Sequence, residues 1–381
     1  MKRNSTKRLR LECLENRNLM AGNVTASISN GDLYVDGDDL DNTITVESAG
    51  VNTVQVRGFN DGNALATSVN GNANGLEIFS GFTGSAFIRL NGGNDLVRVT
   101  NLAMNGSLVV DLAAGDDEAV IGRDTTAGDA RFAGTPSGPL YVAGGVTVLG
   151  GSGQDVVVQS DLHVNGGATV DLGIGDDALR IQRPASSAAN VEYGGSFTIL
   201  PGEGDDSLDV TGLVVTGSLT VDDATGVTAL DMSSMDVYGD FNIFTDQLGD
   251  QIAISATNTR QTLHIVTEGG ADTVNVSGIA NLLLMHTGAA NDDVHVSSSS
   301  INELNIQLGI GADNLDLLSV HSNTIKAFGS TGNDVFLVRN TRALDAFFYG
   351  DGDFDTYRDS TLLANNIRTL RKFSIERSER L

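Results

Sequence analysis

Eleven aspartates occupy one fixed place in a repeated segment, and they are the residues of this chain best suited to chemistry. The complete form of the segment is Gly-x-Gly-x-Asp-x-apolar, and looser versions surround several other members of the set. Carboxylate and backbone carbonyl oxygens are the ligands that Ca²⁺ takes in proteins. The pattern therefore predicts a row of calcium sites. Its ligands are the aspartates Asp95, Asp117, Asp155, Asp177, Asp206, Asp272, Asp292, Asp313 and Asp334, with the turn glycines Gly151, Gly153, Gly173, Gly175, Gly202, Gly204, Gly309 and Gly311.

The aspartates also raise an electrostatic problem that a cation would solve. If the segments stack, neighbouring carboxylates lie ~5 Å apart and repel each other by ~1 kcal/mol in water, and by more in a less polar medium. A divalent cation would neutralise them. In the alternative interpretation each Asp caps its own corner by accepting backbone N–H hydrogen bonds, and Na⁺ screens the remaining charge.

The corners resemble the haemolysin-type (RTX) calcium-binding repeat, Gly-Gly-x-Gly-x-Asp-x-apolar-x. That resemblance implies a secreted β-roll in which the Asp carboxylate and the turn carbonyls coordinate Ca²⁺. RTX repeats recur every nine residues, whereas here one corner recurs every 20–22 residues over positions 91–355. Any calcium row would therefore lie on one side only.

The repeat predicts the architecture that must position these corners. The fixed place, called the anchor here, also includes Asp250 and Asp355, with Asn42 and Thr228 as degenerate members. Around each anchor apolar and polar residues alternate, which indicates strands with one buried face. A third apolar position falls seven residues after many anchors: Leu102, Leu162, Leu213, Met235, Ile279 and Val320.

One such unit cannot bury its own inner face, so copies must stack. The sequence predicts an all-β fold, a single-stranded parallel β-helix (β-solenoid) of about thirteen coils with 20–22 residues per coil. At ~4.8 Å per coil the rod is roughly 60 Å long. A β-sandwich is the alternative, but its hairpins would not produce a fixed long period.

Charge divides the chain into three parts. Residues 1–21 and 358–381 are basic, so the body, 22–357, is even more acidic than the net charge of −26 indicates. We expect an export or sorting segment at 1–21, the solenoid at 22–357 and a capping segment at 358–381. An acidic surface repels phosphate backbones, which excludes nucleic acid as a partner. No apolar run is long enough for a membrane-spanning helix.

The N-terminal segment resembles the Leu-Glu-Pro-Arg-x-Leu-Leu segment of exported proteins from planctomycete-type bacteria. Leu14, Glu15, Arg17 and Leu19 match, whereas Asn16 replaces the Pro and Met20 the second Leu. This resemblance implies export to the cell surface or the extracellular space, although no apolar signal-peptide core is present.

Catalytic motifs are absent from the sequence. The five histidines show no zinc-binding spacing, the single Cys13 excludes a multi-thiolate site, and no nucleophile elbow or phosphate-binding loop occurs. Two longer steps of the repeat, of 38 and 29 residues, contain insertions near 122–138 and 183–193.

The sequence thus predicts a non-enzymatic, exported calcium-binding β-solenoid with a structural or adhesive role. Its expected partners are calcium ions and polysaccharide or other surface components. The alternative is a polysaccharide-active, lyase-like enzyme or a saccharide-binding module that uses the two insertions.

Overall fold

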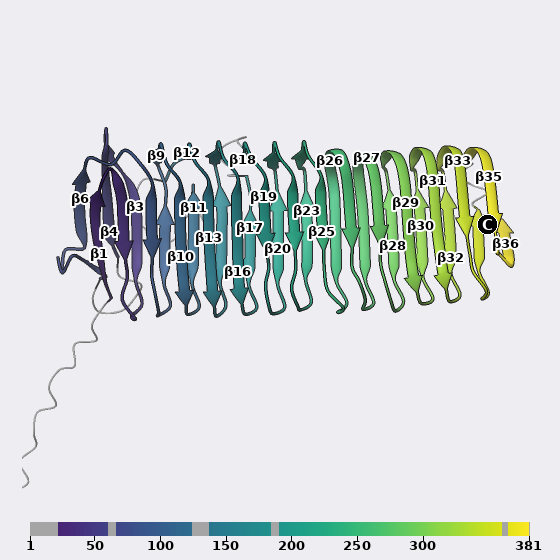
Figure 1. Cartoon of the computed structure of the whole chain (residues 1–381), viewed down its shortest axis with the longest axis horizontal. Helices are drawn as coiled ribbons and strands as arrows, with labels where there is room; N and C mark the ends of the chain where they lie inside the picture. Colours follow the sequence, from purple (N-terminus) through teal and green to yellow (C-terminus); the bar gives the residue numbers. More distant parts are fainter. Residues whose placement is uncertain (1–21, 60–65, 124–136, 184–189, 360–364, 381) are drawn as a thin grey trace, which may run out of the picture.

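The protein is an all-β rod of stacked coils. The computed structural model describes residues 22–59, 66–123, 137–183, 190–359 and 365–380, and within these ranges every regular element is a strand. The purple N-terminal strands lie at one end of the rod and the yellow strands β35 and β36 at the other (Figure 1). Apart from the N-terminal strands, each coil pairs in parallel with the coils before and after it, so the prediction of a parallel β-solenoid is confirmed.

The first coils are three-sided, because each contains three short strands. The first face consists of β2 (Asp32–Asp36), β7 (Ala86–Arg89), β10 (Leu108–Ala114), β13 (Val146–Ser152), β16 (Ala168–Ile174), β19 (Phe197–Leu200), β22 (Leu219–Asp222) and β25 (Phe241–Phe244). The second face consists of β3 (Thr43–Gly50), β8 (Leu96–Val99), β11 (Glu118–Gly122), β14 (Val156–Ser160), β17 (Ala178–Ile181), β20 (Ser207–Thr211) and β23 (Ala229–Ser233). The third face consists of β9 (Leu102–Met104), β12 (Leu140–Val142), β15 (Leu162–Val164), β18 (Val191–Tyr193), β21 (Leu213–Val215) and β24 (Asp236–Val237).

In the later coils, strands continue through corners that separate the short strands of the earlier coils. Two long strands, β26 (Gln251–Val266) and β27 (Thr273–His286), each run over all three faces. The second face then continues with β28 (Asp293–Ser297), β30 (Asn314–Leu318), β32 (Val335–Arg339), β34 (Thr356–Asp359) and β36 (Arg377–Arg380). The third and first faces are joined in β29 (Ser300–Ile310), β31 (His321–Thr331), β33 (Arg342–Tyr349) and β35 (Asn366–Phe373).

Aliphatic side chains stacked in register fill the axis of the rod. On the first face one column consists of Ile88, Val110, Val148, Val170, Ile199, Val221 and Ile243, and all of them are buried. Burial alternates along the strands, as in β10 and β20. Period-2 alternation in the sequence therefore becomes one continuous apolar core.

The N-terminal end departs from the parallel pattern. β1 (Asn23–Ser29) is antiparallel to β2 and parallel to β5 (Ser68–Val69). β4 (Thr53–Gly58) is antiparallel both to β3 and to β6 (Leu76–Ser80). The 53-residue step from Asn42 to Asp95, in which the sequence predicts an irregular coil, thus contains an antiparallel extension. Such an extension replaces the first parallel edge, which would otherwise be open to strand addition.

The C-terminal segment continues the ladder. β35 pairs in parallel with β33, and β36 with β34. The described part of 358–381 therefore forms a last coil, and its Ile367 and Ile375 pack against the hydrophobic core. The described ranges contain no helix that could span a membrane.

Candidate functional site

The anchor aspartates form an internal ladder along one corner of the rod. They are buried, with at most 2% of each residue exposed, and their carboxyl groups link neighbouring coils. The backbone N–H of Asp155, for example, donates to Oδ1 of Asp177 in the next coil at 2.7 Å. Equivalent bonds of 2.6–3.0 Å connect Asn42 to Asp95 and then Asp95 to Asp117, Asp117 to Asp155, Asp177 to Asp206, Thr228 to Asp250, Asp250 to Asp272, Asp272 to Asp292, Asp292 to Asp313, Asp313 to Asp334 and Asp334 to Asp355.

The corner glycines are required by the close stacking of the turns. Gly175 has φ +146°, a value that side-chain-bearing residues rarely adopt, and a Cβ at this position would overlap the carbonyl oxygen of Gly153 in the preceding coil. The same relation holds between Gly173 and Gly151, and Gly202, Gly204, Gly309 and Gly311 likewise meet the carbonyl oxygen of the preceding coil. These turn carbonyls therefore lie against the next glycine along the rod.

One coil exchanges the positions of its acid and its hydroxyl. Thr228 occupies the anchor position, and its hydroxyl donates to Oδ2 of the buried Asp223 at 2.7 Å. Because Thr228 has no carboxylate, the N–H of Asp206 donates instead to the carbonyl of Val227 at 3.1 Å. The ladder is thus interrupted at this single step, but the coil keeps a buried acid, Asp223, close to the anchor position. The repeat pattern does not reveal this acid, because it lies five residues before the anchor.

A second, exposed row lies one residue before the anchors and runs in the opposite direction. Its N–H groups donate to side-chain oxygens of the preceding coil. Asp116 donates from its backbone to Oδ1 of Asn94 at 3.1 Å and accepts from the N–H of Gln154 at 3.0 Å. Asp176 accepts from Asp205 at 3.0 Å. The corner is therefore bonded from both its inner and its outer side.

The inner row is chemically unusual because, in the described part of the chain, ten of its eleven carboxyl groups have one oxygen without a hydrogen-bond partner. Among the described residues, Oδ2 of ten anchors is buried without a hydrogen bond of normal geometry: Asp95, Asp117, Asp155, Asp177, Asp206, Asp250, Asp272, Asp292, Asp313 and Asp334. In three coils a threonine five residues before the anchor (Thr245, Thr267 or Thr287) lies near the carboxyl, but Thr267 and Thr287 donate to backbone carbonyls. A buried charged oxygen without a partner is costly, so it favours neutralisation.

Burial accordingly raises the pKa values of the ladder. The pKa of Asp155 rises to about 7, first through burial and then through Asp117 and Asp116, against the lowering effect of its backbone hydrogen bond from Asp117. Burial likewise raises the pKa of Asp95 to about 8, that of Asp177 to about 7 and that of Asp117 to about 6. Further along the ladder the pKa reaches about 7 at Asp272 and Asp313 and about 6 at Asp334, and it is also raised at Asp206, Asp250 and Asp292.

The hydrogen bonds of the ladder limit which oxygen atoms are available to a cation. Ca²⁺ takes six to eight oxygen ligands. Each anchor aspartate from Asp95 to Asp355 uses Oδ1 for the N–H of the anchor before it. In the part of the chain that the structure describes, no three His, Cys, Asp or Glu side chains gather closely enough to hold a metal ion. Side chains alone do not compose a calcium site, so backbone carbonyls would have to complete it, and calcium binding stays a prediction.

The two predicted insertions fall largely on 124–136 and 184–189, outside the described residues. Side chains near their ends come together on the third face. Nε of Arg123 donates to Oδ2 of Asp161 at 2.8 Å, and His163 lies between Asp161, at 3.9 Å, and Glu192, at 3.2 Å. The ring of Tyr141 stacks on His163 with centroids 5.0 Å apart. Sequence reasoning named the insertions but did not identify this cluster.

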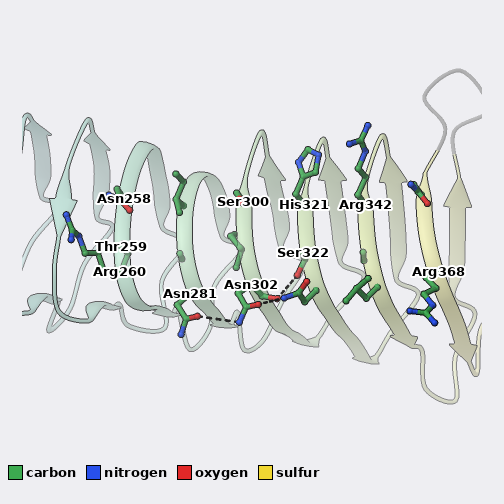
Figure 2. A pocket seen from close by; sticks show the side chains of 17 residues that line it. Asn258, Thr259, Arg260, Asn281, Ser300, Asn302, His321, Ser322, Arg342 and Arg368 are labelled. Atoms are coloured by element: carbon green, nitrogen blue, oxygen red, sulfur yellow. Dashed lines mark hydrogen bonds between the residues drawn. The ribbon is translucent and has the colours of Figure 1, made fainter.

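A groove of about 1010 Å³ follows the third face over the later coils (Figure 2). Two outward columns line it, separated by one inward-facing column. The histidine column consists of Asn258, Ile279, Ser300, His321, Arg342 and Asn366. The asparagine column consists of Arg260, Asn281, Asn302, Asn323, Leu344 and Arg368. Within the latter, Nδ2 of Asn302 donates to Asn281 at 3.4 Å, and Nδ2 of Asn323 donates to Asn302 at 2.5 Å.

One prediction for the third apolar positions is wrong. Five of the six third apolar positions, Leu102, Leu162, Leu213, Met235 and Val320, are buried as predicted, but Ile279 is 57% exposed. The register between β26 and β27 shifts on both sides of this point, and Ala280 takes the inward place. The signal for the groove was nevertheless present in the sequence, because Asn281, Asn302 and Asn323 recur every 21 residues.

Comparison with family models, with curated proteins and with solved structures yields no match to this chain.

Proposed function

We propose that this protein is a non-catalytic structural rod of the bacterial cell surface or extracellular space, with an adhesive role. The observation that carries the proposal is the aspartate ladder. It uses the most chemically distinctive residues of the chain in one column, and at every step from Asp95 to Asp355 but the one at Thr228 these residues bond one coil to the next. Catalysis requires different groups gathered at one place, whereas this repetition serves length and rigidity.

We also expect the ladder to respond to the pH and to the cations around the rod. Ten buried Oδ2 atoms without partners favour uptake of either a proton or a cation. We propose that Ca²⁺ neutralises the corners at neutral and alkaline pH, assisted by backbone carbonyls, and that protons do so in acid. The resemblance of the corners to RTX repeats and the acidic body support the calcium part of this proposal.

Export is proposed from the N-terminal resemblance, which lies outside the described residues. Labelling of intact cells with an antibody against the rod, together with attachment assays on a deletion strain, tests location and role at once. Labelling only after the cells are permeabilised would contradict the surface location, and unchanged attachment of the deletion strain would contradict the adhesive role.

A polysaccharide-active, lyase-like enzyme remains the second candidate, and one observation favours it. The cluster of Arg123, Asp161, His163 and Glu192 brings acid and base groups together beside the two insertions. Incubation with a panel of acidic polysaccharides, followed by ultraviolet absorbance of unsaturated products, distinguishes the candidates. Turnover that is lost in His163→Ala would establish the enzyme and refute the purely structural role.

A further inference from the structure

The groove on the third face differs in charge from the rest of this acidic rod. Its two outward columns place twelve side chains over six coils, and none of them is an Asp or a Glu. They include the exposed Arg260, Arg342 and Arg368, together with the exposed His321. Among the described residues none of these three arginines has a salt-bridge partner, whereas Arg123, Arg339 and Arg358 pair with acids elsewhere.

The acidic side chains at the edges of the groove already have partners. In the preceding coil the histidine column meets Asp236, which accepts a hydrogen bond from Nδ2 of Asn258 at 3.1 Å. The guanidinium of Arg260 lies over the ring of Tyr238, 3.8 Å from its centroid, which holds that cation at the groove end. Glu303, which directly follows Asn302, is paired with Lys326 at 3.2 Å. The groove itself therefore presents cations and amides to a ligand.

The spacing of these groups matches an elongated ligand with a short repeat. Successive coils offer an equivalent side chain every ~4.8 Å, close to the length of one pyranose unit. The amides of Asn281, Asn302 and Asn323 can donate to and accept from hydroxyl groups. The exposed Ile279 and Leu344 add apolar surface for the faces of sugar rings.

We infer that this groove binds a linear, carboxylate-bearing polysaccharide that lies along the rod axis. The arginines and His321 face its carboxylates, and the asparagine column faces its hydroxyls. The inference names the partner chemistry for the adhesive role and in that respect rests on the proposed function, but the binding test below does not depend on it.

Charge density favours a uronate chain over nucleic acid. Duplex DNA carries one negative charge per ~1.7 Å. The groove supplies three arginines and one histidine over six coils, a length of roughly 24 Å. A polymer with at most one charge per sugar unit matches that density, while the acidic remainder of the rod repels a more highly charged polymer.

The test uses the full chain in EDTA, so that calcium cannot bridge protein and ligand. Calorimetric titration compares oligogalacturonate with its methyl-esterified form of the same length, which has the same sugar units without the charges. We expect binding of the charged oligomer that weakens with added salt and at least tenfold weaker binding of the ester. Equal binding of the two forms, no binding of either, or tighter binding of single-stranded DNA would overturn the inference.

Two groove variants and one matched control locate the site. Arg342→Gln removes one unpaired cation and should weaken binding about tenfold, since hydrogen bonds to charged groups are worth about that much. Asn302→Asp keeps the side-chain size but places a negative charge at the groove centre, and should weaken binding more. Arg180→Gln removes an exposed arginine of β17, outside the groove, and should leave the affinity unchanged.

The melting temperatures of all three variants should equal that of the wild type, because the substituted side chains are exposed. Unchanged affinity in both groove variants would place the ligand elsewhere and overturn the inference. Sedimentation of the free protein provides one further check, because self-association that either groove variant abolishes would show that a second copy fills the groove.

Discussion

The substitution Asp155→Asn separates a costly buried charge from a useful hydrogen bond. Asp155 is 1% exposed, its Oδ1 accepts the N–H of Asp117 at 3.0 Å, and its Oδ2 has no hydrogen-bond partner among the described residues. Asparagine keeps the Oδ1 acceptor and the size of the side chain while removing the ionisable group. The chain already carries a buried amide at the anchor position, at Asn42, whose Nδ2 donates to the carbonyl of Leu40 at 2.6 Å.

The sign and size of the effect follow from the pKa of this carboxyl. Burial raises the pKa from 3.8 to about 7. The stability contributed by the protonated carboxyl is therefore complete below pH 3.8 and is lost as the pH rises through 7. Each pKa unit corresponds to about 1.4 kcal/mol, so the ionised carboxyl at pH 8 destabilises the folded state by up to about 4 kcal/mol. Without calcium, Asp155→Asn should be more stable than the wild type at pH 8, and this advantage should disappear near pH 4.

Calorimetric melting in EDTA at several pH values measures the effect. We expect a difference in melting temperature of several degrees at pH 8 that shrinks steadily toward pH 4. Asp231→Asn is the matched control, because it removes the same charge from an exposed position on β23. Destabilisation by Asp155→Asn at pH 8 in EDTA, or a pH dependence equal to that of the control, would refute the account of the ladder.

The remaining predictions concern calcium, the glycine corners and the core. EDTA should lower the melting temperature, and millimolar Ca²⁺ should restore it more effectively than Na⁺ at matched ionic strength; no calcium-specific shift would contradict the calcium proposal. Calorimetric titration should show weaker calcium binding in Asp177→Asn but not in Thr228→Asn. Gly175→Ala should destabilise the rod by a few kcal/mol in chemical unfolding, because its φ is +146° and the Gly153 carbonyl leaves no room for a Cβ; a neutral effect would contradict the stacking of the turns. Val170→Ala should cost about 2 kcal/mol through loss of buried methyl groups, whereas a cost near zero would contradict the packed axis.

The fold could be predicted because it repeats. A period of 20–22 residues with alternating apolar positions permits few architectures, and the anchors from Asp95 to Asp355 all lie in the predicted corner. The antiparallel N-terminal extension could not be predicted, since β4 and β6 carry no copy of the repeat. Its register depends on tertiary pairing rather than on a periodic pattern.

The candidate sites could be predicted only in part. Sequence spacing placed the anchor carboxyls side by side. Their direction, inward onto the N–H of the preceding anchor, depends on backbone geometry. The exchange of Asp223 and Thr228 moves an acid by five positions, out of the periodic template. The 21-residue recurrence of Asn281, Asn302 and Asn323 was present in the sequence. The absence of acids from both outward columns of the groove becomes evident only when the structure places Asn302 beside Asn281.

The central claim is that the corner aspartates form a buried, neutralised, hydrogen-bonded ladder, and infrared titration of the folded protein in EDTA tests it most directly. Protonated carboxyl groups have a carbonyl stretch that ionised ones lack, and a carboxyl group with the ordinary Asp or Glu pKa loses it near pH 4. The account predicts that a carboxyl band persists above pH 5 and disappears between about pH 6 and 8, in line with the pKa values of about 6 at Asp117, about 7 at Asp155 and about 8 at Asp95. Complete loss of the band by pH 5, in protein that remains folded, would contradict it.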